Sequence, residues 1–266
     1  MFHLTYHRPT SVEDAIQFYT NSEDAQFLAG GQTLLPTMKQ RLADPSDIID
    51  LRHIAALVGI GSAEDHLTIG AGVTHAEVAA SQQVRQVLPA LADLASHIGD
   101  PHVRNMGTLG GSVANNDPAA DYPAAVLALD ATIHTNSRVI SAEEFLTGMF
   151  ETALQEGELI IRIDFRIPQQ AAYAKFANPA SRYAMTGVFI ARHIDGSVRV
   201  AITGAGSDGV FRHKEMESAL LGTWSAEALA DIPIDGSNLL SDIHGSAVYR
   251  ANLIKVMAKR AMQSLL

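Results

Sequence analysis

Two glycine pairs are the residues of this chain whose spacing points most directly to chemistry. The pair 30–31 ends the apolar run 26–29, and the pair 110–111 lies between Thr108 and Ser112. Glycine tolerates positive φ and lets a ligand approach the backbone, and a helix N-terminus offers unpaired N–H groups to an anion. Taken singly, the first loop is also explained as a plain strand-to-helix turn. The second is also explained as a turn or a close-packed backbone crossing.

The motifs that are missing narrow the chemistry. Neither loop has the spaced glycines of a Rossmann site, nor the Gly-Lys-Ser/Thr of a phosphate loop, which counts against an ordinary nicotinamide or nucleoside-triphosphate site. The 266-residue chain has no cysteine. Disulfides, thiolate nucleophiles, zinc–thiolate sites and cysteine-ligated iron–sulfur clusters are therefore excluded. Any electron relay must use a bound cofactor or another chain.

Charge and composition argue against other classes of partner. Nineteen basic residues against 29 acidic ones give a net charge of −10, and phosphate backbones require clustered Lys and Arg, so we expect no nucleic-acid partner. No apolar run approaches the roughly 20 residues of a membrane span, and nothing resembles a cationic signal sequence. We expect no membrane span and a cytoplasmic protein. The histidines show no metal-ligand spacing, and Glu143-Glu144 is typical of a helix start, so we expect no metal site and no acid/base catalyst.

Strands and helices that would position these loops follow from the apolar pattern. The expected strands are 2–6, 26–29, 48–51, 58–60, 67–69, 131–135, 159–166, 188–193 and 198–203. The expected helices begin at Thr10 or Ser11 and at Thr33, the latter continuing to Leu42, and also cover 75–80, 88–98 and the C-terminal end. Asp195-Gly196 is a tight hairpin turn. The picture is α+β, with short antiparallel pairs rather than a regular βαβ series.

Read together, the two loops resemble a known family. Ala29-Gly30-Gly31-Gln32-Thr33, followed by Leu34, resembles the first FAD loop of the medium subunit of molybdenum hydroxylases, and Thr108-Leu109-Gly110-Gly111-Ser112 resembles the second. Asn115–Asp121 also fits, and the similarity runs from Tyr6-His7-Arg8-Pro9 to the final helix. The closest likeness is to the aerobic carbon monoxide dehydrogenase medium subunit. The family's second loop often ends in Asn where this chain has Ser112, but serine still donates a hydrogen bond.

The resemblance implies a fold and a domain organisation. The fold is the p-cresol methylhydroxylase (vanillyl-alcohol oxidase) type, with two FAD-binding lobes and a C-terminal lobe of small antiparallel sheet plus helices. The lobes would cover 1–53, 54–170 and 171–266. The best internal boundary in the sequence itself is 168–172.

The resemblance also implies a set of FAD-binding residues. They are Ala29, Gly30, Gly31, Gln32, Thr33, Leu34, Thr108, Leu109, Gly110, Gly111, Ser112, Asn115, Asp117, Asp121, Lys175 and Tyr183. Asp121 would accept hydrogen bonds from ribose or ribitol hydroxyls, and Asn115 would orient the loop or contact the ribitol. Asp117 either accepts hydrogen bonds from the same hydroxyls as Asp121 or caps the turn before Pro118.

Lys175 and Tyr183 would lie beside the isoalloxazine ring, where a cation stabilises the negative charge of reduced flavin. The alternative for this pair is a solvated lysine and a half-buried strand tyrosine.

The implied function is that of an FAD-carrying electron-transfer subunit. A molybdenum-cofactor large subunit would oxidise the substrate, and an iron–sulfur small subunit would pass electrons to the FAD and on to an external acceptor. The missing cysteines fit this division of labour. One alternative is a free-standing flavin oxidoreductase with its own small substrate, although the C-terminal lobe is short for a substrate cap. Another is a scaffold that has lost FAD, against which the intact glycine pairs argue.

Overall fold

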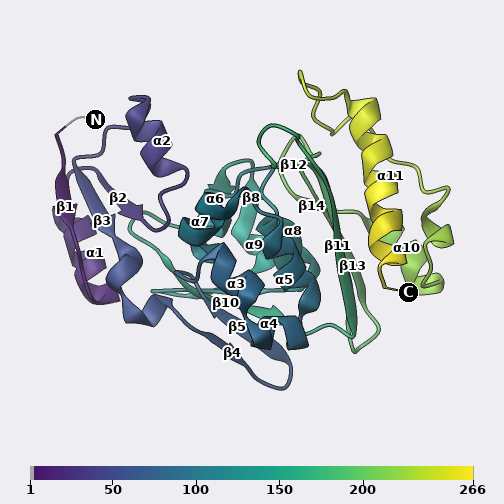
Figure 1. The fold of residues 1–266 in the computed structure, drawn as a ribbon, viewed down its shortest axis with the longest axis horizontal. Coiled ribbons are helices and arrows are strands. Elements are labelled where there is room, and N and C mark those ends of the chain that lie inside the picture. Colours follow the sequence, from purple (N-terminus) through teal and green to yellow (C-terminus); the bar gives the residue numbers. More distant parts are fainter. Residues whose placement is uncertain (1–2, 266) are drawn as a thin grey trace.

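The computed structural model describes residues 3–265, which form three neighbouring regions that follow one another along the chain (Figure 1). The N-terminal region lies at one end of the molecule, the helix-rich middle region at its centre, and the C-terminal sheet with its helices at the other end. Within residues 3–265, no helix combines the length and apolar character that a membrane span requires.

The N-terminal region is a three-stranded parallel sheet with the order β1-β3-β2. Its elements are β1 (Thr5–His7), α1 (Val12–Asn21), β2 (Ala25–Leu28), α2 (Leu34–Lys39) and β3 (Asp47–Asp50). The predicted strand included Phe2, which lies outside the described residues. Both β1 and β2 pair with β3 in parallel, so this sheet differs from the antiparallel pairs expected for the chain as a whole. Helices connect its strands, and such crossovers suit parallel pairing.

The second predicted helix is shorter than the sequence suggested. It begins after Thr33, as expected, but ends at Lys39. Arg41 beyond it has a φ of 61°, and Leu42 is 75% exposed. Leu42 therefore does not belong to the apolar face of this helix, which buries Met38.

The middle region packs helices on a five-stranded sheet with the order β4-β5-β10-β6-β7, whose pairs are all antiparallel. Its strands are β4 (Ile60–Ser62), β5 (His66–Gly70), β6 (Thr132–Thr135), β7 (Val139–Ser141) and β10 (Ile160–Arg166). Its helices are α3 (His75–Ala80), α4 (Gln82–Val87), α5 (Pro89–Ser96), α6 (Pro101–Met106), α7 (Leu109–Asn115), α8 (Tyr122–Ala128) and α9 (Ala142–Phe145). A hairpin of β8 (Leu146–Gly148) and β9 (Glu151–Thr152) completes it.

The C-terminal region is an antiparallel sheet with the order β11-β12-β13-β14. Its elements are β11 (Gln170–Ala177), β12 (Ala184–Arg192), β13 (Val198–Thr203), β14 (Phe211–Arg212), α10 (Lys214–Gly222) and α11 (Ala247–Gln263). The predicted turn at Asp195-Gly196 is confirmed, since Gly196 has a φ of 85° between β12 and β13. No strand was expected at β11, which begins inside the boundary proposed at 168–172.

Strand β12 is buried on both faces because the sheet is covered on both sides (Figure 1). Phe189 and Ala191 join the core formed with the middle helices, whereas Val188 and Ile190 join the core under α11. Successive side chains of a strand point to opposite faces, so one strand ties the two cores together. Residues on its inner face thereby come close to the middle region.

Candidate functional site

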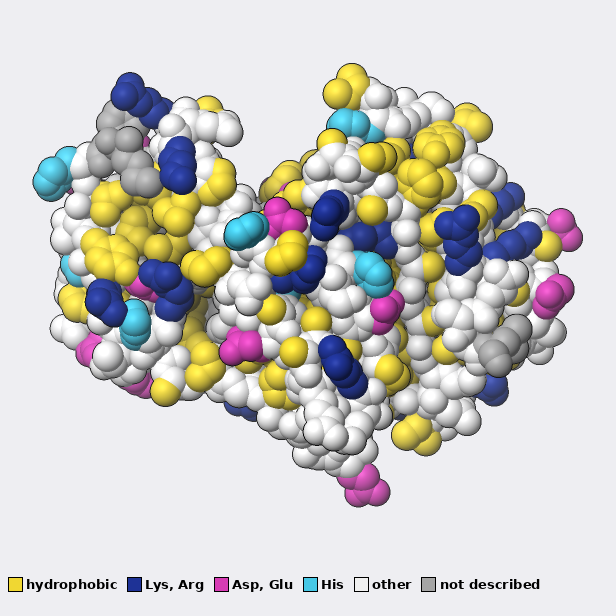
Figure 2. Space-filling model, viewed as in Figure 1, with side chains coloured by type: hydrophobic (Ala, Val, Ile, Leu, Met, Phe, Trp, Pro, Cys, Tyr) yellow, Lys and Arg dark blue, Asp and Glu magenta, His cyan; other side chains and the backbone are white. Residues whose placement is uncertain are grey.

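The two glycine loops meet in a cleft of about 990 Å³ between the N-terminal and middle regions (Figure 2). Segments 26–34, 71–77, 98–121, 154–160 and 181–183 contribute most of its lining. This volume lies at the upper end of the range typical of small-molecule and cofactor sites. All three regions of the chain therefore contribute to one site.

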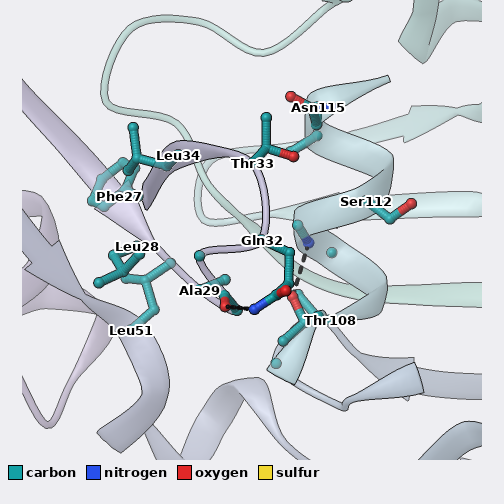
Figure 3. Close-up of a pocket in the computed structure, with 18 of the residues that line it drawn as sticks. Phe27, Leu28, Ala29, Gln32, Thr33, Leu34, Leu51, Thr108, Ser112 and Asn115 are labelled. Carbon is teal, nitrogen blue, oxygen red and sulfur yellow. Dashed lines mark hydrogen bonds between the residues drawn. The ribbon is translucent and has the colours of Figure 1, made fainter. Parts of the chain in front are cut away.

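The first loop touches the segment that leads into the second. A side chain at Gly30 would collide with the carbonyl oxygen of Met106 and would lie 2.6 Å from the Cα of Gly107. Gly31 has a φ of 69°, which favours glycine. Gln32 donates from Nε2 to the carbonyl oxygen of Gly30 at 3.2 Å (Figure 3).

The first loop also offers unpaired backbone donors. The amides of Gly31, Gln32 and Thr33 have no acceptor within residues 3–265. Buried or partly buried N–H groups are normally bonded, so three successive free amides beside a cleft are suited to an anionic ligand.

The second loop is bonded to the protein itself. Thr108 precedes α7, and its Oγ1 accepts a hydrogen bond from the amide of Gly111 at 3.1 Å (Figure 3). Three further amides are bonded inside the chain: Leu109 to Val73 at 3.0 Å, Gly110 to Ala71 at 2.8 Å and Ser112 to Thr108 at 3.0 Å. The amides of these four residues are therefore already paired, in contrast to the unpaired N–H groups that a helix N-terminus ordinarily offers. The polar side chains of Ser112 and Asn115 line the cleft instead.

The two glycines of the second loop differ in what surrounds them. A side chain at Gly110 would press on Ala71, whose carbonyl oxygen would lie at 2.8 Å. A side chain at Gly111 would meet Thr108 Oγ1 at 2.9 Å and the Cβ of Ala29 at 3.6 Å. Gly111 therefore faces the first loop across the narrow part of the cleft.

All the predicted site residues line the cleft except two. Leu109 is fully buried in the apolar core of the middle region. Lys175 is withdrawn from the cleft: its side chain is only 6% exposed, and Nζ lies 2.9 Å from Oδ1 of Asp121 and 2.9 Å from the carbonyl oxygen of His97. The alternative of a solvated lysine is therefore wrong, and a place for Lys175 beside the flavin ring stays a prediction.

Asp121 is a buried carboxyl at the edge of the cleft, 4% exposed. Burial raises the pKa of Asp121, and the Lys175 ammonium and the Tyr173 hydroxyl oppose that rise. Tyr173 lies on β11 next to Lys175 and was not predicted from the sequence.

Asp117 and Tyr183 face the cleft from neighbouring loops. Asp117 Oδ1 accepts a hydrogen bond from the amide of Ala119 at 2.8 Å, so Asp117 caps the turn that contains Pro118. A role for Asp117 in FAD binding stays a prediction. Burial raises the pKa of the Asp117 carboxyl. Tyr183 is 47% exposed, and burial of its hydroxyl, followed by the charges of Asp117 and Asp121, raises its pKa.

Two residues that hold the second loop escaped the sequence analysis. Asn116 ends α7 in the left-handed conformation, and its Nδ2 donates to the carbonyl oxygens of Gly148 and Glu151, both at 2.8 Å. Asparagine tolerates that conformation, which is a signal the sequence did carry. His75 lines the cleft under Gly107, and burial first, then Arg104, lowers its pKa to about 4.

The chemistry that the site can support is binding rather than acid/base catalysis. Within residues 3–265, no group of three or more His, Cys, Asp or Glu side chains is placed to hold a metal ion. The cleft combines free amides, hydroxyls and an internally paired carboxylate, with Leu28, Leu34 and Leu51 on its apolar wall (Figure 3). This donor set fits a large cofactor that carries phosphate groups and an apolar ring.

Comparison with known proteins agrees with that donor set. Residues 2–170 match a family model described as the FAD binding domain in molybdopterin dehydrogenase. The nicotine 6-hydroxylase medium subunit of Paenarthrobacter nicotinovorans is 35% identical, over 97% of this chain and 96% of that protein. The carbon monoxide dehydrogenase medium chain of Afipia carboxidovorans is 32% identical, over 97% and 95%. The solved reconstituted CO dehydrogenase from Oligotropha carboxidovorans superposes with a TM-score of 0.90 at 32% identity, covering 99% of this chain and 98% of that one. The predicted α+β FAD-binding fold is thereby confirmed.

Proposed function

Because this chain belongs to the family of FAD-binding domains of molybdopterin dehydrogenases, we propose that it is the FAD-carrying electron-transfer subunit of a multi-subunit molybdenum hydroxylase. The observation that carries the proposal is the contact of Gly30 with Met106 and Gly107, just before the second loop. It brings amides that are unpaired within residues 3–265 and hydroxyls together on one cleft. When bound, FAD supplies the capacity to accept and release electrons.

The residues of the chain would divide the binding of FAD between them. The unpaired amides of Gly31, Gln32 and Thr33 would donate to pyrophosphate oxygens, and the Ser112 hydroxyl would donate from the opposite side. The absence of a side chain at Gly111 would let the pyrophosphate approach the backbone where the two loops meet. Asp121 and Asn115 would contact the sugar alcohol, and Tyr183 would cover the ring. These roles rest on the positions of the residues around the cleft.

The proposed partners are a molybdenum-cofactor large subunit and an iron–sulfur small subunit. Both relatives named above are called medium subunits or chains, and this chain spans nearly their full length. Their names refer to nicotine and to carbon monoxide at similar identity, which fits a substrate chosen outside this chain. The carbon monoxide dehydrogenase-like assignment and the cytoplasmic location stay predictions.

We also propose that the lobes are 1–53, 54–170 and 171–266. Three separate sheets, β1–β3, β4–β7 with β10, and β11–β14, support this division. The alternative function, a free-standing flavin oxidoreductase, would require the chain to be purified alone and to reduce its flavin with a small substrate. The match to subunits of similar length favours the electron-transfer role.

The test is FAD binding by the full chain and by a Gly111→Val variant. Wild type should retain FAD, visible in its absorption spectrum. Gly111→Val should bind FAD about 100-fold more weakly, because a branched side chain would fill the gap between Thr108 and Ala29, and overpacking of this kind costs about 1–3 kcal/mol. Titration of the flavin-free proteins with FAD measures both affinities.

Gly61→Val is the matched control. Gly61 lies in β4, and among the described residues beyond its chain neighbours no heavy atom stands within 4 Å of a Cβ at this position. Its FAD affinity should equal that of wild type. Equal affinities for wild type and Gly111→Val would contradict the loop assignment, and a wild-type chain that takes up no FAD would contradict the function.

A further inference from the structure

Tyr173 and Asp121 join two regions of the chain through a short hydrogen bond at the wall of the cleft. The Tyr173 hydroxyl on β11 donates to Oδ1 of Asp121 at 2.5 Å, just before α8. Lys175 also bonds the same carboxylate, with Nζ 3.0 Å from Oδ2. Tyr173 is 8% exposed and Asp121 4%, so this bond and ion pair are both removed from water.

A glycine on the neighbouring strand β12 leaves space for the Tyr173 hydroxyl. Gly187 pairs with Lys175 across the β11–β12 ladder, in a strand otherwise rich in large apolar residues. A Cβ at position 187 would collide with the Tyr173 hydroxyl and would lie 2.9 Å from Cγ2 of Thr203. Glycine inside a strand is unfavourable and often marks a close approach of another group. Here that group is the tyrosine hydroxyl.

Asp121 is buried, so the Tyr173 hydroxyl helps to decide whether its carboxyl is ionised or protonated. A buried carboxylate is costly unless it is paired and hydrogen-bonded. Burial raises the pKa of Asp121, and Lys175 and Tyr173 are the main groups that hold it down. If the hydroxyl were removed, the carboxyl would take up a proton more readily. Among the described residues, the His97 carbonyl oxygen would then be the one remaining partner of the buried Lys175 cation.

We propose that Tyr173 is a positioning residue of the flavin site, which keeps Asp121 a carboxylate bonded to Lys175 at the wall of the cleft. The inference rests on the proposed function, because it takes the cleft to hold FAD. A closed ion pair presents little net charge to the ring, whereas a released lysine favours the negatively charged reduced flavin. Tyr173 thereby sets the flavin potential without lining the cleft itself.

Other titratable groups face the cluster of Asp121, Tyr173 and Lys175, and their protonation also contributes to the pH dependence of the site. They are Asp93 and His97 at α5, Tyr122 at the start of α8, and Asp117 and Tyr183 in the cleft loops.

The test is Tyr173→Phe in the full chain, with and without FAD. In the flavin-free chain, infrared spectroscopy should show a new protonated-carboxyl C=O band, identified by its loss when Asp121→Asn is added. FAD affinity should fall about tenfold, because a protonated Asp121 would accept weaker hydrogen bonds from the sugar alcohol than its carboxylate does. The flavin midpoint potential should be more positive than that of wild type at the same pH.

Tyr122→Phe is the matched control. Tyr122 is also buried and adjoins Asp121 in sequence, but within residues 3–265 its hydroxyl has no hydrogen-bond partner. Its infrared spectrum and flavin potential should match wild type. A wild-type carboxyl spectrum and potential in Tyr173→Phe would overturn the inference. If wild type failed to bind FAD, the proposed function would fall, while the infrared comparison would still test the role of Tyr173.

A second variant should break the hydrogen bond between Tyr173 and Asp121 without altering the tyrosine. Gly187→Ala should displace the hydroxyl and produce the same carboxyl band. Its cost in stability should be smaller in the Tyr173→Phe background, since the clash with the hydroxyl is gone. An equal cost in both backgrounds, with no carboxyl band, would contradict the proposal.

Discussion

The two glycine loops have similar sequences but contribute to the cleft in different ways. In the first loop, the amides of Gly31, Gln32 and Thr33 are unpaired within residues 3–265, and the loop rests on the apolar side chains of Leu28 and Leu35. In the second, the amides of 109–112 are bonded inside the chain. The first loop thus supplies backbone donors, and the second supplies hydroxyls on a rigid support.

The glycines within each loop are required for different reasons. Gly30 and Gly110 make room for other parts of the protein, at Met106 and at Ala71. Gly31 supplies a positive φ, and the open side of Gly111 lies towards Ala29 of the opposite loop. Within each pair, one glycine is therefore required for packing and the other for the shape of the cleft. Substitutions at single positions distinguish the two requirements.

The largest effect that we expect on folding comes from Gly30→Ala. The new methyl group would collide with the backbone of Met106 and Gly107, which cannot turn away as a side chain does. The free energy of unfolding should fall by about 3 kcal/mol, the upper part of the usual overpacking cost. Urea unfolding of the flavin-free chain measures this loss.

Gly222→Ala is the control for that substitution. Gly222 ends α10, and among the described residues, its chain neighbours and the nearby helix backbone apart, no heavy atom stands within 4 Å of a Cβ there. Its stability should stay within about 0.5 kcal/mol of wild type or rise, since alanine suits a helix better. If Gly30→Ala were as harmless as Gly222→Ala, the two loops would not be in contact.

The second expected effect is a loss of folding stability at acid pH, caused by protonation of His75 beneath the second loop. His75 donates its backbone amide to the Gly107 carbonyl oxygen at 3.0 Å, and its ring lies under Gly107. Burial lowers its pKa from 6.5 to about 4. The unfolded chain therefore binds the proton more tightly than the folded chain.

The direction of the pH effect follows from that difference. The contribution of His75 to stability is complete above pH 6.5 and is lost as the pH falls from 6.5 to 4. The loss should reach about 3 kcal/mol near pH 4, at about 1.4 kcal/mol per pKa unit. Urea unfolding at a series of pH values should show this slope in wild type and a flatter curve in His75→Gln. Parallel curves would mean that His75 is not held neutral by the fold.

Local features of the site were predictable from the sequence, whereas long-range contacts were not. The glycine pairs, the start of α2 after Thr33 and the Asp117 turn follow from nearby residues, because φ preferences and capping act over a few positions. The contact of Gly30 with Met106 depends on how two regions pack. No local pattern specifies it.

The errors in the prediction have the same origin. Helix α2 was drawn too long because Leu42 continued the apolar spacing, while the chain turns at Arg41. Tyr173 was missed because its function depends on the register that places Gly187 opposite Lys175. His75 was missed because only the fold buries it.

The smallest expected effect distinguishes the two threonines that begin the loop helices. Thr108 accepts a hydrogen bond from the amide of Gly111 as a helix cap, whereas the Thr33 side chain makes no capping bond. Thr108→Ala should cost about 1 kcal/mol of stability, the usual value of a lost N-cap, and Thr33→Ala only a few tenths. Urea unfolding without FAD measures both, and Thr108→Ser should recover most of the loss. Because the Thr33 hydroxyl has no capping bond within residues 3–265 and lines the cleft, FAD should stabilise wild type more than it stabilises Thr33→Ala. Equal costs for the two alanine variants in the absence of FAD would contradict the contrast between a loop bonded to the protein and a loop left open for the cofactor.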